Sequence, residues 1–356
     1  MRAEILETAI KARIFFVMGA NDTGKTTFVR DLANELFRRG YSVGVIDADV
    51  GQSDIGPPTT IGLGTVESVL EHLGDATLQQ FYFVGATSPK GHILSVMIGA
   101  RQMLDQALAL GLQKIIFDTT GLVAGQLGRV LKEHKIAVVN PDVIICLQAH
   151  QECEHILRLY DAFAKPVVLR LAPDSRCRQK TSSERRHYRE TGLQKYFAQA
   201  SNIECSFTEI GLFETTLFSG QPLAPQEIQE FSEILWGKHD ESQTNELKSQ
   251  ISNLKFQILW GEYIGKELHL VTSHRLEHAQ FLKLKQYCPN IAYVRNSTLN
   301  EFENVLVGIL NRRNEFCALG ILRSLDFATC QAIIYTSAAR QDIAGVKLSN
   351  YSIHRT

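Results

Sequence analysis

One nine-residue stretch near the start of the chain constrains the fold more than any other feature. It matches the pattern G-x-x-x-x-G-K-[ST] in full and reads Gly19-Ala20-Asn21-Asp22-Thr23-Gly24-Lys25-Thr26-Thr27. The apolar run 14–18 precedes it and an amphipathic helical pattern follows it, which is the context that this motif demands. The glycines of such a loop let backbone N–H groups surround phosphate oxygens at the positive end of the following helix. The stretch therefore predicts a P-loop whose nine residues bind a nucleoside triphosphate.

Two side chains of this loop carry the expected chemistry. Lys25 should reach the β- and γ-phosphates, and the Thr26 hydroxyl should bind Mg²⁺. The alternative is a chance match in a glycine-rich turn, and the strand pattern before the loop and the helix pattern after it argue against that. The motif leaves the group that receives the phosphate open.

The bulk composition is that of an ordinary globular protein. With 356 residues, 44% of them hydrophobic and 21% charged, the chain can bury a large core, and its length suggests about two domains. No apolar run approaches the roughly 18 residues of a membrane span, and residues 1–13 lack the pattern of a signal peptide. We therefore expect a cytoplasmic protein with no membrane partner.

Charge and cysteine content argue against two further classes of site. The net charge of −1 gives the whole molecule no bias towards nucleic acid, so a polyanion would have to contact a local basic patch. The seven cysteines contain no C-x-x-C pair, so neither a zinc site nor a redox motif is indicated.

The pattern of residues 13–211 predicts an α/β fold with a mostly parallel sheet, because short, continuously apolar runs alternate with helical stretches. The expected strands are 14–18, 43–46, 81–84, 114–117, 143–147, 167–171 and 206–210. The expected helices are 26–39, 98–110, 125–134, 153–163 and 183–200. Ligands of such sheets bind at the carboxyl ends of the strands.

The pattern changes near Trp236. Residues 237–253 are polar and indicate a linker or an exposed helix. Short strand-like runs follow, with one helix expected near 276–287, and they predict a smaller, mainly β module. These runs are 256–260, 267–271, 291–294, 305–309, 318–322 and 332–335. We therefore expect a P-loop kinase domain over 1–236, a linker over 237–253 and a C-terminal domain over 254–356.

Two carboxylates follow the second expected strand, at Asp47 and Asp49. Side chains two residues apart on an extended chain point the same way, so both can serve one site. We interpret Asp47 as the carboxylate that supports Mg²⁺ and Asp49 as the base that accepts a proton from the attacking hydroxyl. The alternative is that one of them caps a turn, as aspartate often does.

Two further features could complete a phosphate site. A strand end with two hydroxyls and a glycine turn stands at Thr119-Thr120-Gly121, although such residues also end many strands for structural reasons alone. Residues 176–195 hold seven Lys and Arg against two Glu. Arg185 and Arg189 are four apart, hence on one helix face, and could close over triphosphate oxygens as a lid. The alternative is a solvated basic helix face.

These elements together resemble the P-loop polynucleotide 5′-hydroxyl kinases related to the RNA kinase of the pre-mRNA cleavage complex and to the kinase of ribosomal RNA processing. The P-loop of that family resembles residues 19–27, its D-x-D-x-G-Q segment 47–52, its T-x-G-W clasp 119–122 and its arginine lid 180–197. A further segment of the family resembles residues 83–89. Leu122 stands where the clasp has Trp, and Lys180 stands where the lid has its first Arg. We expect a short form without the N-terminal β domain of eukaryotic members.

The resemblance implies an ATP-dependent kinase that phosphorylates the 5′-hydroxyl ends of RNA or DNA. It implies catalytic roles for Lys25, Asp49, Arg185 and Arg189, and substrate contacts for Gln52, Thr119, Thr120 and Gly121. A second hypothesis is an ATP-binding assembly factor of an RNA-processing complex, with the C-terminal domain as the docking surface for a protein partner. A third is a small-molecule kinase of similar topology. The order of the motifs disfavours this third hypothesis.

Overall fold

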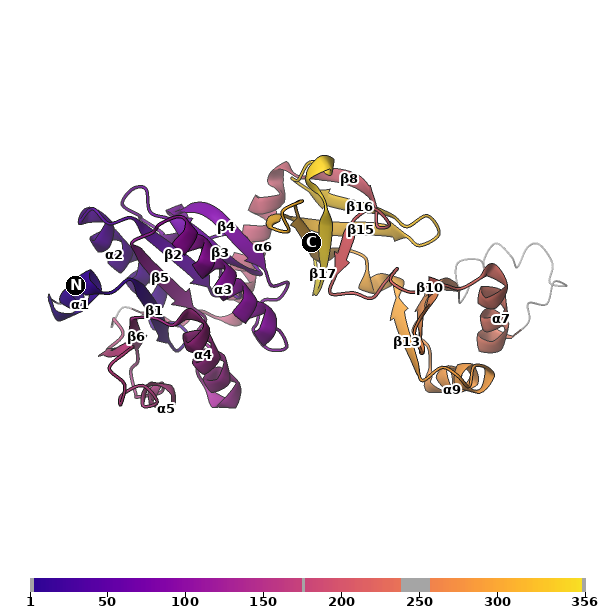
Figure 1. Cartoon of the computed structure of the whole chain (residues 1–356), viewed down its shortest axis with the longest axis horizontal. Coiled ribbons are helices and arrows are strands. Elements are labelled where there is room, and N and C mark those ends of the chain that lie inside the picture. Colours follow the sequence, from indigo (N-terminus) through magenta and orange to yellow (C-terminus); the bar gives the residue numbers. More distant parts are fainter. Residues whose placement is uncertain (1–2, 175–176, 238–256, 354–356) are drawn as a thin grey trace. The chain divides into compact units, whose positions relative to one another are not determined.

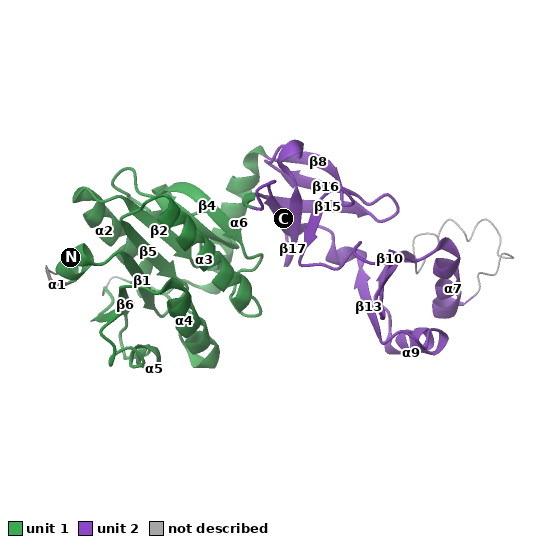
Figure 2. Cartoon of the chain, in the orientation of Figure 1, with its two compact units in different colours: residues 1–199, 315–317 green, residues 200–314, 318–356 purple. Residues whose placement is uncertain are grey.

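The computed structural model describes residues 3–174, 177–237 and 257–353. They form two compact units, one of residues 1–199 with 315–317 and the other of residues 200–314 with 318–356 (Figure 2). The division falls between Gln199 and Ala200, whereas the sequence pattern placed the end of the kinase domain at Trp236. The expected linker, 237–253, lies outside the described residues apart from Gly237.

The first unit is built on a seven-stranded sheet with the order β4-β3-β2-β5-β1-β6-β7 (Figure 1). Strands β2, β5, β1, β6 and β7 run parallel, and β3 is antiparallel to both of its neighbours. The strands are β1 Ile14–Gly19, β2 Val43–Ala48, β3 Thr60–Thr65, β4 Thr77–Phe83, β5 Lys114–Thr119, β6 Val143–Leu147 and β7 Val167–Leu171. The expected α/β P-loop core is confirmed.

Helices cover both faces of this sheet. Helix α2 packs through its apolar stripe on one face, where its residues share a core with Phe15 and Val17. Helix α4 lies on the other face, because Lys132 on it stands over the ring of Phe16, and successive strand residues point to opposite faces. The helices are α1 Ala3–Lys11, α2 Lys25–Arg38, α3 Ile93–Ala109, α4 Gly125–Val139, α5 Glu154–Leu157 and α6 Ser182–Tyr196, with 3₁₀ turns at Leu73–Asp75 and Phe197–Gln199.

Three expectations for residues 13–211 are corrected by the structure. Strand β3 was not expected, because its glycines hide the strand pattern. A Cβ on Gly62 would lie 2.0 Å from the Ile55 carbonyl oxygen, so the close approach of two backbone segments requires glycine there. The helix expected over 153–163 is much shorter in the structure, where α5 covers only Glu154–Leu157. In place of the strand expected over 206–210 the structure has β8, Ser201–Ser206, which belongs to the second unit and pairs antiparallel with β16, Gln331–Thr336, instead of joining the parallel sheet.

The second unit holds two sheets, of the orders β10-β11-β12-β13 and β8-β16-β15-β14-β17-β9. Separate apolar cores fill them, so the smaller, mainly β domain is confirmed. Its elements are β8 Ser201–Ser206, β9 Gly211–Phe213, β10 Gln221–Pro222, α7 Pro225–Trp236, β11 Ile258–Ile264, β12 Glu267–Thr272, α9 His278–Tyr287, β13 Tyr293–Thr298, β14 Val305–Leu310, β15 Phe316–Asp326, β16 Gln331–Thr336 and β17 Gly345–Ser352, with 3₁₀ turns at Leu299–Glu301 and Arg340–Asp342. Within the described ranges, no helix of either unit is long and apolar enough to cross a membrane.

Candidate active site

The P-loop joins β1 to α2 through glycines at two positions where the backbone leaves no room for a side chain or has a positive φ. Gly24 caps the helix with φ 81°, a left-handed conformation that glycine adopts without strain. At Gly19 a Cβ would lie 2.3 Å from the Leu147 carbonyl oxygen, so only glycine fits beside β6. The Lys25 side chain is buried, and its Nζ donates to the Ala20 carbonyl at 2.7 Å. The ammonium is therefore folded back over its own loop.

A hydroxyl–carboxylate pair lies at the start of α2. The Thr26 hydroxyl donates to Oδ2 of Asp118 at 2.7 Å, while Oδ1 of Asp118 is buried and has no hydrogen-bond partner among the described residues. Burial raises the pKa of Asp118 to about 6, against the lowering effects of the Thr26 hydrogen bond and the Lys25 charge. A buried carboxylate oxygen without a donor, beside a threonine, fits Mg²⁺, which takes few protein ligands along with phosphate and water oxygens.

Sequence reasoning did not single out Asp118 for the metal. The expectation for Asp47 assumes that β2 lies directly beside the P-loop strand β1. In the sheet, β5 lies between β1 and β2, so the neighbouring strand is the one that carries Asp118 next to its last residue. The available signal was the aspartate directly before the clasp, at the end of an apolar run.

Asp47 is buried and fully engaged by its own loop. Its Oδ1 accepts from the backbone N–H of Asp49 at 3.0 Å, and its Oδ2 accepts from those of Asp54 at 2.6 Å and Ile55 at 3.1 Å. Burial, followed by the charge of Asp118, raises the pKa of Asp47 well above its usual range. The geometry therefore gives Asp47 the capping role that was the alternative interpretation. We call residues 47–55 the acceptor loop.

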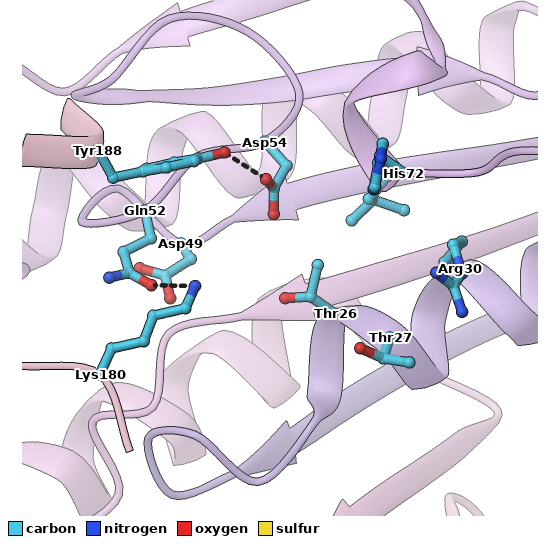
Figure 3. A pocket seen from close by; sticks show the side chains of 10 residues that line it. Thr26, Thr27, Arg30, Asp49, Gln52, Asp54, His72, Lys180 and Tyr188 are labelled. Atoms are coloured by element: carbon cyan, nitrogen blue, oxygen red, sulfur yellow. Dashed lines mark hydrogen bonds between the residues drawn. The ribbon is translucent and has the colours of Figure 1, made fainter. Parts of the chain in front are cut away.

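Asp49 and Gln52 of the acceptor loop line a polar cavity of about 240 Å³ (Figure 3). The backbone N–H of Gly51 donates to Oδ1 of Asp49 at 3.0 Å, which orients the carboxylate. The cavity is lined by Thr26, Thr27, Arg30, Asp49, Gln52, Asp54, His72, Leu73, Lys180 and Tyr188. Asp49 as the expected base, Thr26 as the expected magnesium ligand and Lys180 of the lid segment thus line one cavity.

The clasp lies against the P-loop. A Cβ on Gly121 would stand 2.0 Å from Oδ1 of Asn21 and 2.6 Å from its backbone nitrogen, so the glycine permits this approach. The end of β5 is fixed by Lys132, which is fully buried and donates to the Thr119 hydroxyl at 2.7 Å and to the Thr120 carbonyl at 2.6 Å. Sequence reasoning missed Lys132, which has no motif around it. Its only signal was a lysine on the inward face of an amphipathic helix.

The lid helix α6 turns its predicted arginines towards the site. Arg185 forms an ion pair with Asp22 of the P-loop at 2.5 Å, and Nη1 of Arg189 donates to the Gly51 carbonyl at 3.5 Å. Nε of Arg189 is buried and has no partner within the described chain. Other arginines of this segment pair outward, as Arg186 does with Glu190. The basic stretch is therefore not uniformly a solvated face.

The P-loop, the polar cavity and helix α6 thus bring most of the predicted site residues together. The P-loop residues, Asp49, Gln52, the two lid arginines and the clasp glycine converge at the carboxyl ends of β1, β2 and β5. Asp47 lies next to these residues, but both of its carboxylate oxygens already accept backbone hydrogen bonds. The Thr119 hydroxyl donates to the Val17 carbonyl at 2.8 Å and lies inside the sheet edge.

Residues 19–199 match the family described as mRNA cleavage and polyadenylation factor CLP1 P-loop. A polyribonucleotide 5′-hydroxyl-kinase of Pyrococcus abyssi is 28% identical over 92% of this chain and 83% of its own length. One of Pyrococcus furiosus is 30% identical over 90% of this chain and 81% of its own length. The solved structure of the wild-type Clp1p–Pcf11p complex has the same fold, with a TM-score of 0.58 and 12% identity over 96% of this chain and 74% of that one.

Proposed function

This chain belongs to the CLP1 P-loop family, and from that premise we propose that it transfers the γ-phosphate of ATP to the 5′-hydroxyl end of RNA. It is a polynucleotide 5′-hydroxyl kinase. The observation that carries the acceptor side of the proposal is the cavity that Asp49 shares with Thr26 and Lys180. In this cavity, Asp49 has a carboxylate oxygen that can accept the proton of a hydroxyl group. It faces the residues that would surround the transferred phosphoryl group.

The residues divide the reaction between them. The 5′-oxygen of the acceptor attacks the γ-phosphorus, the bond from that phosphorus to the bridging oxygen of ADP breaks, and the hydroxyl proton passes to Asp49. Lys25 and the P-loop N–H groups hold the β- and γ-phosphates. Arg185 and Arg189 stabilise the charge on the equatorial oxygens of the phosphoryl group in the transition state.

Thr26 and Asp118 would hold Mg²⁺, with Asp118 in place of the Asp47 ligand expected from the sequence. The support is the orphaned Oδ1 of Asp118, whereas both oxygens of Asp47 already accept backbone hydrogen bonds. The ion, when bound, neutralises charge on the phosphate oxygens. Asp47 then acts by positioning the acceptor loop, which carries Asp49.

The decisive experiment is transfer of labelled γ-phosphate from ATP to short 5′-hydroxyl RNA oligomers. We expect transfer by the wild-type protein and none by Lys25→Ala, since that change removes the ammonium at the phosphates and leaves the backbone loop in place. Thermal unfolding of both proteins serves as the control for folding. Wild-type protein without transfer activity, or Lys25→Ala with full activity, would contradict the proposal.

Two further expectations from the sequence extend the proposal. We propose that the C-terminal unit docks a protein partner of RNA processing and that the kinase works in the cytoplasm. Co-purification of partner proteins with the full chain, followed by cross-linking that locates the contact on this unit, tests the first point, and cell fractionation tests the second.

A further inference from the structure

The mechanism above leaves one wall of the cavity unused. It is formed by Asp54 of the acceptor loop and Tyr188 of the lid helix, and the Tyr188 hydroxyl donates to Oδ1 of Asp54 at 2.5 Å. The backbone of Asp54 is fixed as well, because its N–H donates to Asp47 at 2.6 Å. Figure 3 shows the second carboxylate oxygen of Asp54 pointing into the cavity. Asp54 is thus a carboxylate held at both ends with one oxygen presented to a ligand.

The chemistry of this oxygen restricts the ligand group that it can contact. An ionised carboxylate accepts hydrogen bonds or binds a cation, so its partner within a nucleic acid must carry an O–H or N–H group and cannot be a phosphate or a carbonyl oxygen. Burial raises the pKa of Asp54, while the Tyr188 hydrogen bond and the Lys180 charge lower it. The wall therefore suits a hydroxyl of a sugar better than any other part of the backbone of a nucleic acid.

The position of Asp54 indicates which sugar this is. Asp49 and Thr26 line the same cavity and mark the place where the 5′-oxygen meets the phosphoryl group. With about 240 Å³, the cavity is smaller than a site for a drug-sized ligand and suits the first sugar of the acceptor rather than several nucleotides. Ribose carries a 2′-hydroxyl that can donate to a carboxylate, and deoxyribose does not.

The opposite end of the cavity is lined by side chains that carry N–H groups. Arg30 and His72 stand there, across from Asp54 and Tyr188 (Figure 3). Arg30 is held in place, since its Nη1 donates to the Glu71 carbonyl at 3.0 Å and its Nη2 pairs with Asp31 at 2.7 Å. Donors at this end suit the phosphate that follows the first sugar, so the cavity as a whole matches a sugar-phosphate unit.

We propose that Asp54, held by Tyr188, accepts a hydrogen bond from the 2′-hydroxyl of the 5′-terminal nucleotide and makes the kinase select RNA ends over DNA ends. This inference rests on the proposed kinase function, and it assigns the specificity of that function to a named pair of residues. Asp54 contacts the substrate sugar directly, whereas Tyr188 is a positioning residue that acts through Asp54.

The test compares oligoribonucleotides that differ only at the 2′-position of the first nucleotide. The substrates carry a hydroxyl, a hydrogen or a fluorine there, and only the hydroxyl donates. For the wild-type protein we expect kcat/KM to fall about 10- to 100-fold without the hydroxyl, the usual value of a hydrogen bond to a charged group. Asp54→Ala should lower kcat/KM for the ribose substrate to the deoxyribose value and leave the deoxyribose value unchanged.

Two further variants separate specificity from loss of structure. Glu67→Ala removes an exposed carboxylate that does not line the cavity, and it should keep the wild-type preference. Tyr188→Phe keeps the ring but releases Asp54, so it should reduce the preference by a smaller factor. If the tyrosine only fastened the lid, this change would lower kcat/KM for both substrates equally.

The outcomes for the inference and for the function are distinct. Transfer to both substrates with no wild-type preference, or with a preference that survives Asp54→Ala, would overturn the inference and leave the kinase intact. Absence of transfer to every substrate would overturn the proposed function and the inference together.

Discussion

Strands β2 and β5 both end in a buried aspartate, yet the two carboxylates have opposite surroundings. Asp47 accepts three backbone hydrogen bonds from its own loop, and Asp118 accepts one from Thr26 and keeps a buried oxygen without a donor in the described structure. Position at a strand end and burial therefore do not identify a metal ligand. The unsatisfied oxygen of Asp118 supports our proposal that Asp118 is the metal ligand, because a protein rarely buries a carboxylate oxygen without a partner unless a ligand completes it.

The largest effect should come from the remaining carboxylate of the β2 end, Asp49. Asp49→Asn keeps the shape but cannot take the proton, so we expect kcat to fall about 10²- to 10⁴-fold while the Kd for ATP stays near its wild-type value. Single-turnover transfer and equilibrium nucleotide binding measure the two quantities. An equally small loss from Asp49→Asn and Asp47→Asn would place the base elsewhere.

Asp47→Ala should act mainly on stability. The change leaves the backbone N–H groups of Asp49, Asp54 and Ile55 without their acceptor, and we expect the free energy of unfolding to fall by about 2–4 kcal/mol. Urea denaturation measures it. If the variant loses its response to Mg²⁺ but keeps its stability, Asp47 is a metal ligand and the contrast between the two strand ends is wrong.

Asp118→Asn should act on the metal rather than on the fold. We expect the Mg²⁺ concentration for half-maximal activity to rise about 10- to 100-fold, as when a metal site loses a supporting group. A protonated carboxyl binds Mg²⁺ poorly, and the pKa of Asp118 is raised to about 6. The wild-type Mg²⁺ requirement should therefore increase as the pH falls through about 6, and the variant should lack this dependence. Activity titrated with Mg²⁺ at several pH values tests both statements.

The smallest effect concerns two buried lysines on α4, behind the end of β5. Lys132 is bonded to the clasp, whereas Nζ of Lys135 is buried with no partner among the described residues. Burial lowers the pKa of Lys135 to about 8. The unfolded chain binds that proton more tightly, so stability should rise with pH between about 8 and 10.5. Lys135→Met should remove this rise and stabilise the protein at neutral pH by about 1–2 kcal/mol.

Lys132→Met is the matched control for that prediction. It removes the donor to Thr119 and Thr120, so it should lower the free energy of unfolding instead of raising it. Thermal unfolding across the pH range reads out both variants. A gain in stability from each of them would mean that the clasp does not depend on Lys132.

Local features of the sequence were sufficient for the P-loop, the parallel strands and the lid. Each depends on residues within one strand–turn–helix or on one helix face, as the spacing of Arg185 and Arg189 does. Features that depend on the order of the strands within the sheet could not be predicted from the sequence. Strand β5 lies between β1 and β2, which is why we propose Asp118 instead of Asp47 as the metal ligand, and no local pattern encodes that order.

Two other differences have the same origin. The pairing of β8 with β16 joins segments more than 120 residues apart, and loop length gives no hint of it. Strand β3 contains Gly62 and Gly64, which have a low strand propensity and so conceal the strand. They are present because they allow close contact with Ile55. The C-terminal runs were predicted as strands because each is apolar and short, but β17, α7 and the division into two sheets were not predicted.

Because Arg185 forms an ion pair with Asp22, the Asp22 carboxylate of the P-loop competes with the phosphate groups of a nucleotide for the Arg185 guanidinium. A triphosphate can recruit this arginine only by displacing a carboxylate that is already in place at 2.5 Å. In the proposed mechanism, nucleotide exchange would therefore replace one anion by another on the Arg185 guanidinium. When ADP leaves, the Asp22 carboxylate would pair with Arg185 again.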